Sequence, residues 1–172
     1  MVQPSAVYEE RLPFPFALGA SVVIGALAVM MAVLLVLQVT GNPVGERPAP
    51  DWFYLVMFVF LSAIALFVLN FRALFIGMTP QEITVAYGCI RRTVPWGDIE
   101  GCFWDESPTF SYGGWGIRIT RVSGRWRLVY NLIGSPVVIL RLRSGRFREF
   151  GFSTRNPEQV LELVRRQAAV HG

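Results

Sequence analysis

Residues 16–37 read FALGASVVIGALAVMMAVLLVL, and residues 52–69 read WFYLVMFVFLSAIALFVL; neither stretch contains a charged residue. At about 1.5 Å per helical residue the first stretch covers roughly 33 Å, enough for the ~30 Å hydrocarbon core of a bilayer. The second is near the lower length limit, and Arg72 extends it because a long basic side chain reaches the interface. The sequence therefore predicts transmembrane helices at residues 16–39 and 52–72.

These helices are expected to form an antiparallel hairpin behind a short N-terminal tail at residues 1–15. The connecting loop, residues 40–51, is rich in Gly and Pro and cannot continue a helix. Its only basic residue is Arg47, whereas Arg72 and two further arginines follow the second helix. The positive-inside rule then predicts a multi-pass protein of the cell (inner, cytoplasmic) membrane with both termini cytoplasmic.

Two further features of the helices suggest roles. The expected membrane-interface anchors are Trp52, Tyr54 and Arg72, since aromatic and basic side chains favour the headgroup level. The first helix also carries small residues at steps of four, three and four, which allow another helix to approach closely. This stripe consists of Ser21, Gly25, Ala28 and Ala32. It would contact either the second helix of the same chain or a different subunit of a larger membrane complex.

Residues 73–172 have a different pattern and are expected to form a cytoplasmic α+β domain. Short alternating runs separated by turn residues predict about seven antiparallel strands in a sandwich or partly open barrel. The expected strands are residues 83–87, 92–96, 100–104, 116–120, 125–130, 137–142 and 146–152. One C-terminal amphipathic helix should cap them, with Asn156 as N-cap and an apolar stripe that includes Val160 and Val164.

Four short motifs support a family resemblance. They are TPQEITV at residues 79–85, VPWGDI at 94–99, YGGWGIR at 112–118 and NPE at 156–158. With the strand pattern and the two preceding helices, the chain resembles prokaryotic two-transmembrane-helix proteins that carry a bacterial pleckstrin-homology-like (PH-like) domain. The resemblance implies a fold and a membrane location. It carries over no catalytic or ligand-binding residue, because these families are largely of unknown function.

The composition excludes several kinds of chemistry. All 16 basic residues are arginine, so lysine Schiff bases and Walker-type phosphate loops are ruled out. The only histidine, His171, is next to the last residue, and the two cysteines are too few for a disulfide scaffold. We therefore expect no enzyme, no cofactor and no metal site. A hydrolase built on Asp98 and its acidic neighbours is the weaker alternative.

The arginines are concentrated in residues 79–172, where 13 of them stand against 8 acidic residues. Two-residue turns at Ser123-Gly124 and Ser144-Gly145 would place the flanking arginines on shared sheet faces. The candidate anionic-surface contacts are Arg118, Arg125, Arg127, Arg141, Arg143, Arg146 and Arg148. The same periodicity places Trp126 and Phe147 on the core face, which, with the membrane anchor, argues against nucleic acid as the partner.

These observations predict a membrane-anchored, non-enzymatic interaction or scaffolding protein. Its domain would recruit an unidentified protein partner and contact anionic lipid headgroups through the arginine face. A solvated arginine face without function is the competing interpretation. The alternative function is that of an accessory subunit of a larger integral-membrane complex, assembled through the first helix.

Overall fold

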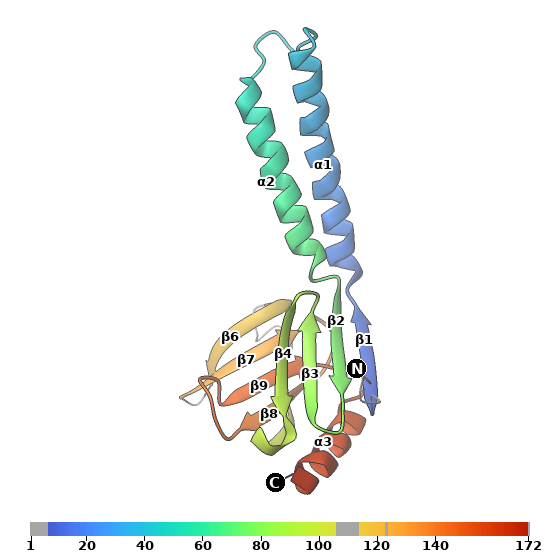
Figure 1. Cartoon of the computed structure of the whole chain (residues 1–172), viewed down its shortest axis with the longest axis vertical. Helices are drawn as coiled ribbons and strands as arrows, with labels where there is room; N and C mark the ends of the chain where they lie inside the picture. The colour runs from blue at the N-terminus through green and yellow to red at the C-terminus, as the bar shows by residue number, and fades with distance from the viewer. Residues whose placement is uncertain (1–6, 106–113, 123, 172) are drawn as a thin grey trace. The chain divides into compact units, whose positions relative to one another are not determined.

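The computed structural model describes residues 7–105, 114–122 and 124–171 (Figure 1). The chain divides into two compact units. One is a helical unit, Phe14–Arg72. The other combines the segment that ends at Pro13 with everything from Ala73 onward, and it contains all the strands.

The helical unit consists of α1 (Pro15–Val39) and α2 (Asp51–Leu69), as the sequence predicts. α1 begins with Pro15, which suits the first helical position because that N–H has no partner in a helix. Their most apolar windows have mean hydropathies of 2.8 and 2.6, and only 11% and 0% of these windows is buried. Both helices are long and apolar enough to cross a membrane. The second is shorter than expected, because the chain turns at Asn70–Arg72.

The first sheet corrects the prediction of an N-terminal tail. It has the order β1 (Tyr8–Pro13), β2 (Ala73–Met78), β3 (Glu82–Tyr87) and β4 (Ile90–Pro95), all antiparallel. β1 lies within the expected tail and pairs with β2 over its whole length. The pairing is stable because Leu12 is fully buried together with the alternate residues of β2. The domain therefore includes residues from both sides of the helical unit.

The second sheet contains β5 (Ile99–Asp105), β6 (Gly116–Val122), β7 (Arg125–Asn131), β8 (Val137–Leu142) and β9 (Glu149–Ser153). Their order is β5-β8-β9-β7-β6. The expectation of an entirely antiparallel arrangement is wrong, since β7 and β9 run parallel. The cause is geometric: β7 and β8 run in opposite directions, and β9 lies between them. Since β9 returns antiparallel to β8, it runs in the same direction as β7.

The core of the domain lies between these sheets. Tyr87 of β3 stacks on Tyr130 of β7 with ring centroids 6.0 Å apart, and its hydroxyl donates to the Asn131 carbonyl at 2.7 Å. Burial raises the pKa of the Tyr87 hydroxyl. Trp96, in the 3-10 turn η1 (Trp96–Asp98), is fully buried. The C-terminal helix α3 (Pro157–His171) buries Val160 and its stripe against β5, η1 and β8, as predicted.

Candidate functional site

The β6–β7 hairpin has the predicted register. Val122 pairs with Arg125, so the turn is made by the two residues between them, of which Ser123 lies outside the described residues. Gly124 has a φ of +80°, a left-handed conformation that glycine adopts without strain in such turns. By this register Arg118, Arg125 and Arg127 lie on one face of the sheet.

That shared face does not form a single arginine surface. Arg118 and Arg125 are exposed, and the Arg118 guanidinium lies beside Gly114. Arg127, between them in the register, is only 6% exposed. It lies next to an apolar cluster on the same face, made of Val129, Val137, Ile139 and the half-buried Phe103. The face is therefore part core and part surface, so Arg127 is not available to a partner.

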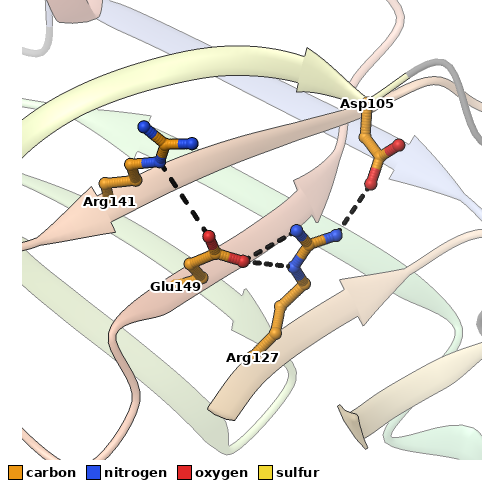
Figure 2. Close-up of polar contacts among 4 residues, drawn as sticks. All are labelled: Asp105, Arg127, Arg141 and Glu149. Carbon is orange, nitrogen blue, oxygen red and sulfur yellow. Dashed lines mark hydrogen bonds and ion pairs between the residues drawn. The ribbon is translucent and has the colours of Figure 1, made fainter. Parts of the chain in front are cut away.

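Buried Arg127 is neutralised by two carboxylates (Figure 2). Its Nη1 lies 2.8 Å from Asp105 Oδ2, and its Nε and Nη2 each lie 2.7 Å from Glu149 Oε2. The second oxygen of Glu149 faces Arg141 Nε at 3.9 Å. Arg141 is half-exposed and its guanidinium lies 5.0 Å from the Phe103 ring centre. These four charged residues join β5, β7, β8 and β9 into one ionic cluster, which has a structural role.

The predicted turn at Ser144-Gly145 is wrong. Arg141 is opposite Glu149 rather than Arg148, and residues 143–148 form a longer loop between β8 and β9. Asp98, from η1, holds this loop: its carbonyl accepts from the Arg143 N–H at 2.9 Å and its carboxylate from the Ser144 hydroxyl at 2.9 Å. The observed register also pairs opposite charges across the strands instead of like charges, which is the more stable arrangement.

Arg143, Arg146 and Arg148 therefore belong to a loop, where all three are exposed. The Arg148 guanidinium donates to the Arg143 carbonyl, and the Arg146 guanidinium lies 5.8 Å from the Phe147 ring centre. The predicted face of four aligned arginines does not exist. Basic residues are still gathered there, but on a loop whose shape is set by hydrogen bonds to η1.

The exposure of Trp126 contradicts a second expectation, that this side chain lies in the core. It lies on the face expected for the core, together with Leu128 and Tyr130, yet its side chain is 45% exposed. Arg121 is directly opposite it, with the guanidinium 5.8 Å from the ring centre. Ile119, diagonal to Trp126 on the same face, is 57% exposed. The hairpin end thus presents an apolar surface flanked by arginine that strand periodicity alone assigns to the interior.

One polar cluster was not expected from the sequence. The Glu10 carboxylate of β1 accepts hydrogen bonds from the Thr154 hydroxyl at 2.6 Å, the Arg155 N–H at 2.9 Å and the Tyr8 hydroxyl at 2.9 Å. Burial is the main cause that raises the pKa of Tyr8. The cluster ties the strand before α1 to the segment before α3, 144 positions away. No local pattern signals it, because its members are so distant in sequence.

The small-residue stripe of α1 is used within the helical unit. Ser21 and Ala28 are buried, and Gly25 and Ala32 are half-buried. Since α2 is the only other helix of this unit, the stripe faces α2, and the Ser21 hydroxyl bonds back to the Ala17 carbonyl at 2.8 Å. This contact matches the first of the two roles considered for the stripe. Gly25 and Ala32 remain partly exposed.

The expected membrane-interface anchors occupy both ends of α2. Trp52 is exposed, and the Tyr54 hydroxyl accepts from the Ala49 N–H of the connecting loop at 3.3 Å. Arg72, past the other end, is exposed, and its carbonyl accepts from the Phe14 N–H at 2.7 Å. The side chains of Trp52 and Arg72 are thus exposed, as the prediction requires, whereas Tyr54 contacts the loop.

No group of three or more His, Cys, Asp or Glu that could hold a metal is present among the described residues. Asp98 and Asp105 are engaged in the contacts given above, and burial raises the pKa of the Cys102 thiol, which lies 3.8 Å from the Leu161 carbonyl. No known protein family, curated protein or solved structure matches this chain. Its role is therefore inferred from its own residues.

Proposed function

We propose that this chain is a membrane-anchored, non-catalytic interaction module, with the helical unit in the cytoplasmic membrane and a PH-like domain on the cytoplasmic side. The observation that carries the proposal is the pairing of β1 with β2. These strands immediately precede α1 and follow α2, and they are paired from Tyr8–Met78 to Pro13–Ala73. The helical hairpin is thus an insertion within a β-ribbon, so the sheet and the membrane anchor are joined through two short connections.

The exposure of the helices supports the membrane assignment. A long apolar helix of a soluble protein is buried in its core, whereas α1 and α2 expose large side chains such as Val22, Leu66 and Phe67. Contiguous apolar surface on this scale is rare on soluble monomers and is expected for a lipid-facing segment. A bilayer would cover these side chains at no cost in unsatisfied backbone groups, since helices pair their own.

The strand pairing also supports a topology with both ends on one side. Two hydrogen-bonded strands cannot lie on opposite sides of a bilayer, so the segments before α1 and after α2 share a compartment. The arginine distribution favours the cytoplasm for that compartment, because the α1–α2 loop holds only Arg47 among basic residues. The domain, with two sheets and a C-terminal helix, fits the PH-like resemblance, although its parallel β7–β9 pair departs from the expected pattern.

A non-catalytic role is supported by the state of the acidic residues. Asp105 and Glu149 both lie against Arg127 and form ion pairs with it. A carboxylate pair used in hydrolysis needs room for substrate between its members. Here the arginine fills that space. The remaining arrangement of exposed loops on a rigid sandwich suits binding rather than bond cleavage.

Cysteine labelling in intact cells and in inverted vesicles tests the proposal. Cys89 is exposed on the domain and provides a natural label in a Cys102→Ala background. The matched variant is Val44→Cys in a chain that lacks both native cysteines, because Val44 is exposed in the α1–α2 loop. A membrane-impermeant maleimide should reach Cys89 only in inverted vesicles, and it should label the Val44→Cys variant only in intact cells. Labelling of both from one side, or release of the chain by carbonate, would refute the membrane-spanning arrangement.

A further inference from the structure

The β6–β7 hairpin and the β8–β9 loop lie at the same end of the second sheet, as the strand pairing shows. β9 is parallel to β7, with Arg127 opposite Glu149, so both strands begin at this end. β8 is antiparallel to β9 and ends there. The two connections are therefore close neighbours, since adjacent strands are about 4.8 Å apart. Figure 1 shows both at the left margin of the domain.

We call this region the basic end. Its exposed residues are Ile119, Arg121, Arg125, Trp126, Arg143, Arg146 and Arg148. The neighbouring acidic groups among the described residues are Glu149, Asp105, Asp98 and Glu100. Glu149 and Asp105 are paired with Arg127, Asp98 is bonded to the loop, and Glu100 is exposed. Within the described part of the chain, five exposed arginines thus face one exposed acid, so the region attracts an anionic surface.

The apolar members of the basic end narrow down the kind of partner. Trp126 and Ile119 are about half-exposed on one face, and the Arg121 guanidinium lies within cation–π distance of the tryptophan ring. A tryptophan with arginine beside it is suited to the headgroup level of a bilayer, where the ring contacts apolar groups and the guanidinium binds phosphate. Ile119 and Trp126 are diagonal neighbours on one face, so their exposed surfaces are adjacent rather than scattered over the domain.

We propose that the basic end docks on an anionic lipid bilayer, with Trp126 and Ile119 entering the interface and the arginines binding headgroup phosphates. The proposal rests on the function proposed above, since a chain fixed in a membrane has a bilayer as its nearest anionic surface. The β6–β7 hairpin and the β8–β9 loop are separate in sequence and both contribute, so the docking surface exists only in the folded domain. It replaces the single arginine face that the sequence suggested.

The test uses the full chain in nanodiscs of phosphatidylcholine, mixed with separate vesicles with and without phosphatidylglycerol, and measures co-flotation. We expect flotation only with the anionic vesicles and its loss at high salt, where charges are screened. The triple variant Arg121→Gln, Arg125→Gln and Arg146→Gln should weaken binding by roughly fivefold per arginine, or about a hundredfold in total.

Matched controls separate a docking surface from net charge. The triple variant Arg91→Gln, Arg155→Gln and Arg166→Gln removes the same charge from exposed positions elsewhere and should bind almost normally.

The apolar contribution has its own pair of variants. Trp126→Ala should weaken binding, whereas Trp104→Ala should not, although Trp104 is 44% exposed and comparable in that respect. Hydrogen exchange on the same samples should show slower exchange in residues 119–127 only when anionic vesicles are present.

Several results would overturn the proposal. An equal loss of vesicle binding in the two triple Arg→Gln variants would mean that net charge, rather than a defined site, causes the binding. Binding to both vesicle types would exclude anionic selectivity. Flotation with neither type, with retention of the nanodiscs on immobilised polyglutamate, would assign the basic end to an acidic protein. Failure to enter nanodiscs at all would instead contradict the membrane anchor, so the two proposals fail in distinguishable ways.

Discussion

Removing the membrane anchor should give a folded soluble domain only if β1 is kept. The Phe14 N–H donates to the Arg72 carbonyl at 2.7 Å, next to the Pro13–Ala73 pair. Replacing residues 15–71 by Asn-Gly therefore closes β1 and β2 with the two-residue turn that such a hydrogen-bonded pair favours. In contrast, a fragment of residues 79–172 lacks both strands.

The cost of losing these strands follows from burial. Four side chains of β1 and β2 are at most 1% exposed: Leu12, Leu74, Ile76 and Met78. Each contributes about 1.5–3 kcal/mol when fully buried, so the fragment loses roughly 6–12 kcal/mol. Domains of this size have a total unfolding free energy of about 5–15 kcal/mol. The fragment is therefore expected to be unfolded or aggregated.

Circular dichroism and urea unfolding, followed by the fluorescence of buried Trp96, would compare the two chains. The spliced chain should unfold cooperatively, and the fragment should show no transition. If the fragment unfolds with the same midpoint as the spliced chain, β1 and β2 contribute nothing and the reasoning is refuted. A spliced chain that fails to fold would show that the helices are needed for the domain.

Three further predictions concern single residues, each tested by the urea unfolding of the spliced chain or of the full chain in detergent. Arg127→Met should destabilise the domain by about 3–5 kcal/mol, because two buried carboxylates lose the guanidinium that they share. Exposed Arg125→Met should have almost no effect, and similar values for the two variants would contradict the ionic cluster. Glu10→Ala should cost about 2 kcal/mol through its lost hydrogen bonds, and exposed Glu9→Ala is the control that should differ from it. Tyr87→Phe should cost about 1 kcal/mol at neutral pH, through its hydrogen bond to the last carbonyl of β7. The pKa of the Tyr87 hydroxyl is raised in the folded state, so the unfolded chain loses this proton at a lower pH. The unfolding free energy of the wild type should therefore fall as the pH rises above about 10, by up to roughly 1.4 kcal/mol per pH unit. The unfolding free energy of the Tyr87→Phe variant should fall less steeply.

The seven predicted strands correspond to β3–β9, and the sequence pattern misses β1 and β2 for two different reasons. β2, ALFIGM, has the alternation of a strand, with its even-numbered residues buried, but it follows an apolar helix and its pattern merges with that run. β1, YEERLP, buries only Leu12. Its stability comes from a partner strand on the far side of the helical hairpin, which no local window contains. Local periodicity identifies strands that alternate by themselves, and it cannot identify one that is defined by its partner.

The arginine turns illustrate the same limit. Ser-Gly occurs at both, and both glycines have positive φ, +80° at Gly124 and +93° at Gly145. The first closes a two-residue hairpin and the second does not, because Asp98 binds the backbone and side chain at the start of the second loop. A dipeptide can indicate that the chain turns. How many residues the turn needs depends on what other segments bind to it.

Trp126 shows how these two kinds of information combine to create a surface. Alternation correctly assigns Trp126, Leu128 and Tyr130 to one face of β7. Along that face the exposed fraction rises from 3% at Tyr130, which stacks on Tyr87, through 8% at Leu128 to 45% at Trp126. Alternation decides on which face of β7 a side chain lies, but burial on that face decreases toward the hairpin end. Trp126, a side chain of core type, is therefore left outside the core, beside exposed arginines from two loops. The sequence supplies these residues, and their position at the end of the sheet exposes them.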